Sequence, residues 1–304
     1  MGNVLSTRAD NGHASHLTES QRRRRSTWKG FVRSLSWKLL VEEKQQDQRG
    51  AGSGETDSEK DMDLRLTNRG VLLVGAISAT SCAVLRLVLR DLLRKQAWYK
   101  PNHPGMFELC ALGTIHAALL AYYGIKKCFF PRTSWMDPRG CKRLISASLG
   151  YFMHDFLALR SMWADDPTMV VHHLAGLALL GSALHKPEVY PMVGPYAVIE
   201  LSTIFLNGIA MLREVRMEDT PLNHACLGLF VVTFFVTRVV WMPYVTARFY
   251  DHERMKALGR ARPGLLVLTV LNIYWFKAII AKVQRALAKR APAVAAMSAV
   301  SAVQ

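Results

Sequence analysis

Two adjacent histidines, His172 and His173, lie inside the apolar stretch "MVVHHLAGLALL", residues 169–180. An imidazole can act as a general base, carry an acyl group or bind a metal ion. Adjacent residues on a helix point about 100° apart, whereas metal sites on helices use spacings of three or four residues. The apolar runs of this chain contain no H-x-x-H or H-x-x-x-H pattern. The sequence therefore predicts no metal site around this pair.

Polar side chains also interrupt the neighbouring apolar runs. An ionisable group inside a bilayer costs about 2.5–3.5 kcal/mol or more unless it is paired or faces a hydrated cavity. Six consecutive runs each carry at least one such polar residue, which predicts that these six runs surround a shared polar interior. The residues are His116, His154, Asp155, His172, His173, Glu200, Thr203, Asn207, Arg238 and Asn272.

These residues divide into two groups by the chemistry they could do. A histidine beside a carboxylate is oriented and made more basic, so His172, His173, Asp155 and Glu200 are the candidate catalytic residues. The others are interpreted as cavity-lining or structural polar residues: His116, His154, Thr203, Asn207, Arg238 and Asn272. Arg238 is the natural ion-pair partner of Glu200 or Asp155. The alternative is that such a pair only determines the order of the helices, without a functional cavity.

Seven apolar runs must position these side chains, and about 20 apolar residues suffice to cross a bilayer. No run has the regular charged face of a soluble amphipathic helix. We therefore predict the all-α class, a polytopic membrane helical bundle of about seven transmembrane helices. The first run has only small hydroxyl residues at its centre and is expected to lie outside a six-helix core. The runs are 71–90, 106–125, 144–163, 168–185, 190–212, 222–247 and 263–282.

The composition agrees with a membrane protein. Half of the 304 residues are hydrophobic, and the formal net charge is +16. This charge suits anionic membrane surfaces, and no nucleic-acid partner is expected because no aromatic side chains line a basic groove. The five cysteines are scattered and odd in number, with no C-x-x-C pair, which argues against a disulfide scaffold or a zinc site. The first 70 residues contain no early apolar core, so no signal peptide is expected.

The distribution of charge predicts three regions and an orientation. Residues 1–69 form a basic, largely disordered tail, residues 70–285 form the membrane domain, and residues 286–304 form a short C-terminal tail. The loops 126–143 and 248–262 are rich in Lys and Arg. Since positively charged loops face the cytosol, we expect the N-terminus to be cytosolic and the protein to be an integral multi-pass membrane protein.

The N-terminal tail contains two signals for membrane attachment. Gly2 in "MGNVLS" fits the N-myristoylation pattern, which a chance match could also produce. Residues 22–40 carry seven basic side chains and no acidic one, and the apolar residues within 26–40 follow helical spacing. This pattern predicts an interfacial amphipathic helix that binds an anionic membrane surface. A solvated basic tail or a calmodulin-binding segment are the alternatives.

Five motifs occur in order, each on its own run: "GYFMHDFLAL", "VVHHLAG", "AVIELSTIFLN", "FFVTRVVWMPY" and "LNIYWFKAI". Together with "GTIHAALLAYYGI" upstream, they resemble the TLC-domain family over residues 70–285. The resemblance is to the members that are not ceramide synthases, and it is more distant to the ceramide synthases. It implies a bundle of six core helices, endoplasmic reticulum or related membranes, and a role with lipids, sphingolipids among them.

The resemblance leaves several functions open. Ceramide synthases have a histidine pair followed by an "H-D-x-x-D" segment, and here "IELSTIFLN" stands in place of that second segment. We therefore expect a lipid-homeostasis protein that binds a lipid or acyl chain in its helical cavity. One alternative is an N-acyltransferase that uses acyl-CoA as a substrate and needs no bound cofactor. Another is a non-enzymatic trafficking or cargo receptor of the endoplasmic reticulum. Membrane lipids are the expected partners, and a homodimer is left open.

Overall fold

The computed structural model describes residues 68–103, 105–130 and 138–301, which all belong to one compact unit, residues 55–304. The N-terminal tail, with Gly2 and the predicted helix 26–40, lies outside the described residues. Every regular element in the described part is helical. The main elements are α3 (Asn68–Arg94), α4 (Met106–Phe129), α5 (Pro138–Ala158), α6 (Pro167–Leu184), α7 (Tyr190–Ala197), α8 (Leu201–Glu214), α9 (Pro221–Phe234), α10 (Met242–Phe249), α11 (Glu253–Lys256) and α12 (Gly264–Ser301).

Six helical segments among the described residues are long and apolar enough to cross a membrane. Three of them combine several elements, namely Pro187–Glu214, Pro221–Phe249 and Gly259–Arg285. The predicted run 144–163 corresponds to α5, which is not among the six and which includes Arg139, Lys142 and Arg143 near its start. The prediction of an all-α polytopic membrane bundle is confirmed, with α5 as the least apolar of its long helices.

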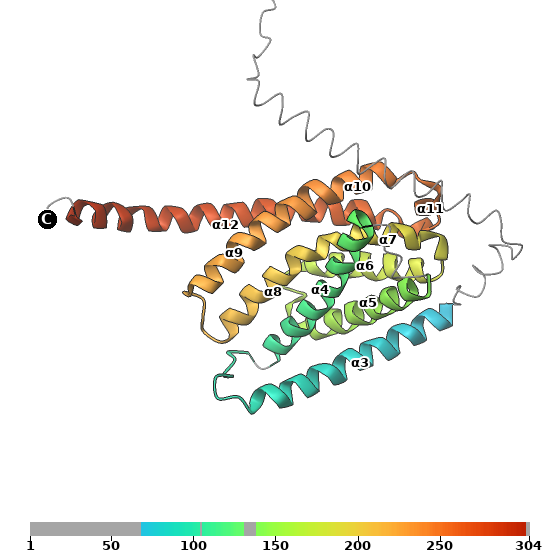
Figure 1. Ribbon diagram of the computed structural model, residues 1–304, viewed down its shortest axis with the longest axis horizontal. Helices are drawn as coiled ribbons and strands as arrows, with labels where there is room; N and C mark the ends of the chain where they lie inside the picture. The colour runs from blue at the N-terminus through green and yellow to red at the C-terminus, as the bar shows by residue number, and fades with distance from the viewer. Residues whose placement is uncertain (1–67, 104, 131–137, 302–304) are drawn as a thin grey trace, which may run out of the picture. The chain divides into compact units, whose positions relative to one another are not determined.

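The helices form a ring with α3 outside it. Contacts run from α5 to α6, from α6 to α12, from α12 to the α9–α10 segment, then to α8 and α4, and back to α5. The helix α3 packs mainly against α5 and lies along the edge of the bundle in Figure 1. This arrangement agrees with the expected six-helix core and one peripheral helix.

Local sequence explains where several helices begin. Asp166 precedes α6, and its carboxylate accepts hydrogen bonds from the backbone N–H groups of Thr168 and Met169, while Pro167 occupies the first helical position. Thr220 precedes α9 in the same way, and its hydroxyl oxygen accepts a hydrogen bond from the backbone N–H of Asn223. This helix also begins with a proline, Pro221. The residues before α6 and α9 therefore satisfy backbone donors that would otherwise be unpaired.

Two spans contain irregular helical turns near their middle. Val198–Glu200 forms a short 3₁₀ helix between α7 and α8, close after Pro195. Phe235–Trp241 forms a π-helix between α9 and α10. The Trp241 indole N–H donates to the Pro195 carbonyl at 2.7 Å, which joins the two irregular regions. Mid-helix 3₁₀ and π turns often mark functional positions, and these two turns hold Glu200 and Arg238.

Candidate functional site

Arg238 is the centre of a buried cluster of polar side chains from three helical segments. Its side chain donates from Nε to Ser202 Oγ at 2.8 Å, from Nη1 to Asn272 Oδ1 at 3.2 Å and from Nη2 to Thr203 Oγ1 at 2.8 Å. Arg238 is only 6% exposed, and its guanidinium also lies 5.5 Å from the ring centre of Phe234. These contacts satisfy most of the donor groups of a charge that would otherwise be very costly to bury.

Glu200 supplies the negative charge of this cluster. Its Oε2 atom accepts a hydrogen bond from Thr203 Oγ1 at 2.8 Å, and its Oε1 atom lies 3.8 Å from Arg238 Nη2. Of the two partners predicted for Arg238, the structure therefore selects Glu200 and not Asp155. We call Glu200, Ser202, Thr203, Arg238 and Asn272 the Arg238 cluster.

The second polar group is formed by His173 with Asp155 and the backbone of Met169. His173 Nε2 lies 2.8 Å from Asp155 Oδ2, and Nδ1 lies 2.9 Å from the Met169 carbonyl oxygen. Two acceptors face the ring, so a proton must lie on each nitrogen, or Asp155 must carry one. His173 has no ring nitrogen left for a substrate in this arrangement.

The His172 side chain points in a different direction from that of His173, because adjacent residues on a helix lie about 100° apart around its axis. Its ring lies 5.3 Å from that of Trp275, and its Nδ1 atom is buried without a hydrogen-bond partner among the described residues. The Trp275 indole N–H donates to Thr168 Oγ1 at 2.9 Å, which fixes the indole beside His172. The two histidines therefore occupy different environments.

The remaining predicted residues form smaller contacts. His116 Nε2 lies 3.1 Å from Ser148 Oγ, and its ring stacks on Tyr151 with the ring centres 4.1 Å apart. The Asn207 amide nitrogen is close to Gly113, where an added Cβ would lie 2.8 Å from it. His154 is buried, and its Nδ1 atom has no hydrogen-bond partner among the described residues. It therefore belongs neither to the Arg238 cluster nor to the group formed by His173 and Asp155.

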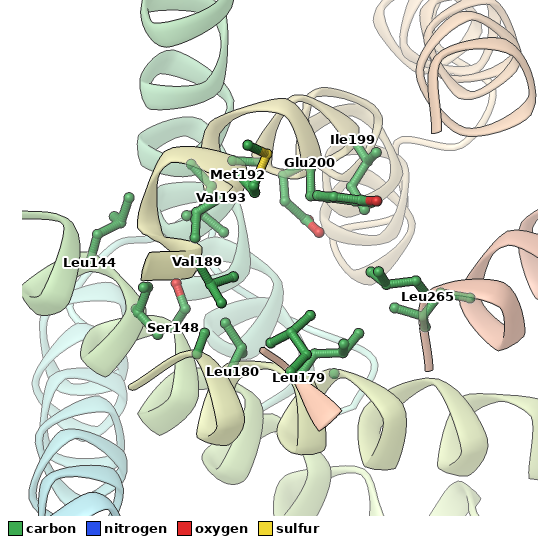
Figure 2. A pocket seen from close by; sticks show the side chains of 18 of the residues that line it. Leu144, Ser148, Leu179, Leu180, Val189, Met192, Val193, Ile199, Glu200 and Leu265 are labelled. Atoms are coloured by element: carbon green, nitrogen blue, oxygen red, sulfur yellow. The ribbon is translucent and has the colours of Figure 1, made fainter. Parts of the chain in front are cut away.

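An apolar cavity of about 150 Å³ lies between the Arg238 cluster and the end of the bundle where α12 begins. Figure 2 shows side chains of α7, such as Val193, facing Leu180 of α6 across this space, with Leu265 of α12 at one side. Met255 and Leu258 line it from the segment between α10 and α12. The lining is almost entirely hydrocarbon, and its polar side chains are Ser148, Tyr196 and Glu200.

Phe152 lies between the cavity and three of the histidines. This side chain lines the cavity, and its ring centre lies 5.7 Å from His173, 6.0 Å from His172 and 6.1 Å from His116. Of the four candidate catalytic residues, only Glu200 lines the cavity. Sequence reasoning missed Ser148 and Phe152, because a serine and a phenylalanine on an apolar helix carry no signal of their own.

Within the described residues, no group of three or more His, Cys, Asp or Glu side chains is placed to hold a metal ion. All five cysteines are unbridged. The fold and the site define a polytopic membrane protein with buried charge and a hydrocarbon-lined cavity.

Comparison with known proteins identifies the family. The family model described as the TLC domain matches residues 65–281, which is most of the chain, and the chain therefore belongs to the TLC-domain family. TLC domain-containing protein 4 of Xenopus tropicalis is 28% identical over 155 residues, which cover 46% of this chain and 59% of the relative. TLC domain-containing protein 4-B of Danio rerio is 26% identical over 192 residues, which cover 58% of this chain and 72% of the relative.

The chain thus spans about three fifths of the length of the Xenopus tropicalis relative. TLC domain-containing protein 4-A of Xenopus laevis gives the same identity and coverage, 28% over 155 residues. No solved structure matches the chain. The family resemblance drawn from the five sequence motifs is confirmed, and so is the likeness to members outside the ceramide synthases.

Proposed function

We propose that this TLC-domain protein binds a lipid or an acyl chain in the cavity between α5, α6, α7 and α12, and that it acts in membrane lipid homeostasis. The observation that carries this proposal is a cavity of about 150 Å³ with a hydrocarbon lining. An enclosed apolar cavity of similar size in another protein binds a small apolar molecule such as benzene. An aliphatic segment is the ligand that such a lining favours.

The contacts of the histidine pair favour binding over acyl transfer. An acyl carrier or general base needs a ring nitrogen that can reach the reacting atom. Both nitrogens of His173 are already hydrogen-bonded, to Asp155 and to the Met169 carbonyl, and neither histidine lines the cavity. The N-acyltransferase function therefore has weaker support than lipid binding.

Filling the cavity should remove the bound lipid. We expect Val193→Trp to reduce the lipid that co-purifies with the protein by about fivefold to 150-fold, because an indole would fill the cavity and overpacking costs about 1–3 kcal/mol. The measurement is mass spectrometry of lipid extracts from protein after exhaustive detergent exchange. Val270→Trp is the matched control, since Val270 lies on α12 with 65% exposure and does not line the cavity. Equal lipid content in the two variants would contradict the proposal.

We further propose an endomembrane location, the endoplasmic reticulum above all, with the N-terminus in the cytosol. Figure 1 shows α3 and α12 beginning at the same end of the bundle. Exposed basic side chains lie at helix ends on this side: Lys127 near the end of α4, Arg143 near the start of α5, Arg248 near the end of α10, Lys256 in α11 and Arg260 just before α12. Basic loops face the cytosol. An epitope placed at the N-terminus should be accessible to antibody in cells permeabilised only at the plasma membrane. An epitope reached only after the internal membranes are also opened would reverse this orientation.

A further inference from the structure

The cavity has two chemically different ends. Val189, Met255 and Leu258 line it at the end of the bundle where α12 begins, and all of them are apolar. Glu200 lines it near the middle of the bundle, eleven residues after Val189 in the same span. At a helical rise of ~1.5 Å per residue, the two residues lie on the order of 15 Å apart along the span. A ligand that fills the cavity therefore meets hydrocarbon along its length and a carboxylate at the inner end.

The hydrogen bonds at this inner end leave one acceptor unused. Glu200 Oε2 accepts from Thr203, whereas no described residue donates a hydrogen bond to Oε1, which is 3.8 Å from Arg238 Nη2. The Glu200 side chain keeps 12% of its surface exposed. Of the other polar lining residues, Ser148 is engaged with His116, and the Tyr196 hydroxyl oxygen is buried within the wall. A carboxylate oxygen in an apolar cavity is costly unless a donor pairs with it.

Arg238 does not make this end attractive to anions. Its guanidinium donates to Ser202, Thr203 and Asn272, and its side chain is not part of the cavity lining. The group that a ligand meets first is therefore the negative one. Like charges repel strongly where the surroundings are apolar.

We propose that the inner end of the cavity is a subsite for an uncharged lipid headgroup that donates a hydrogen bond to Glu200, such as the hydroxyl of a fatty alcohol or of a neutral monoacyl lipid. This inference rests on the proposed lipid binding and deepens it by naming the class of ligand. Fatty-acid carboxylates and phosphate headgroups are excluded from the subsite by charge. Esters without a donor bind less well because they leave Oε1 unpaired.

The test uses four ligands that share an unbranched eight-carbon chain and differ in the headgroup at its end. Purified full-length protein in detergent at pH 7.5 is photo-crosslinked with an octanol analogue that carries a diazirine in its chain. Octanol, octanamide, methyl octanoate and octanoate then compete, at concentrations corrected for their partition into the detergent. We expect octanol and octanamide to compete equally well, methyl octanoate about tenfold less well, and octanoate about a hundredfold less well or more.

A variant separates the effect of charge from that of shape. Glu200→Gln keeps the size of the side chain and removes its charge, so octanoate should then compete at least about tenfold better than with the wild-type protein. Tyr196→Phe is the matched control, because it changes another residue of the lining without altering Glu200, and it should preserve the order of the four ligands. If Glu200→Gln does not fold, the order of the four ligands on the wild-type protein decides the question.

The possible failures are distinguishable. Saturable crosslinking with equal competition by octanol and octanoate would overturn the headgroup subsite and leave lipid binding intact. Crosslinking that none of the four ligands reduces, or that maps outside the cavity lining, would overturn the proposed lipid binding itself.

Discussion

Replacing Glu200 with leucine is expected to destabilise the protein by about 3–5 kcal/mol, because it leaves the Arg238 charge buried without its counter-ion. Arg238 is 6% exposed, and Glu200 is the acidic residue that pairs with it. The hydrogen bonds that Arg238 donates to Ser202, Thr203 and Asn272 remain, but they do not neutralise the charge. The measurement is the free energy of unfolding from a titration with sodium dodecyl sulfate in mixed micelles.

Two further variants make this prediction specific. Glu253→Leu is the matched control, since the Glu253 side chain is 84% exposed on α11, and the change should stay within about 0.5 kcal/mol. The double variant Glu200→Leu with Arg238→Met should recover most of the lost stability, because it removes both charges and fills the space with apolar atoms. A double variant that is less stable than Glu200→Leu alone would show that the cluster is not held together by this charge pair.

Replacing Gly150 with alanine is expected to displace α3 from the bundle. A Cβ atom at position 150 would lie 2.1 Å from Ser78 Cβ, 2.6 Å from the Ser78 carbonyl carbon and 2.7 Å from the Ala79 nitrogen. Because two of these are backbone atoms, rotation of a side chain cannot relieve the clash. The helix α3 packs mainly against α5, so the displacement should cost at least about 1–3 kcal/mol.

The consequence for α3 can be measured directly. The rate at which protease cleaves between α3 and α4 should rise in Gly150→Ala, and the midpoint of thermal unfolding in detergent should fall. Gly228→Ala is the matched control, because nothing lies within 4 Å of the added Cβ. That variant should be unchanged or more stable by up to about 1 kcal/mol, since alanine favours the helix over glycine. Similar behaviour of the two variants would mean that α3 does not depend on this close approach.

The class of fold was predictable from the sequence because hydropathy over about 20 residues is a local property. The runs that contain His116, Arg238 and Asn272 each became a long helix, and the first run became the peripheral α3. The basic side chains Arg139, Lys142 and Arg143 at the start of α5 are also visible in the sequence, and they make α5 less apolar than the other long helices. The five motifs identified the family for the same reason, since each lies within one helix.

The sequence by itself determined that charged and polar side chains would meet inside an apolar bundle, and that Arg238 needed an acidic partner. Only the tertiary structure decided that Glu200 is that partner and that Asp155 pairs with His173. The reason is that the direction and depth of a side chain depend on how its helix is rotated and kinked against its neighbours. The 3₁₀ turn that ends at Glu200 and the π turn around Arg238 change both. The histidine pair that dominates the sequence therefore lies behind Phe152, while the cavity ends at Glu200.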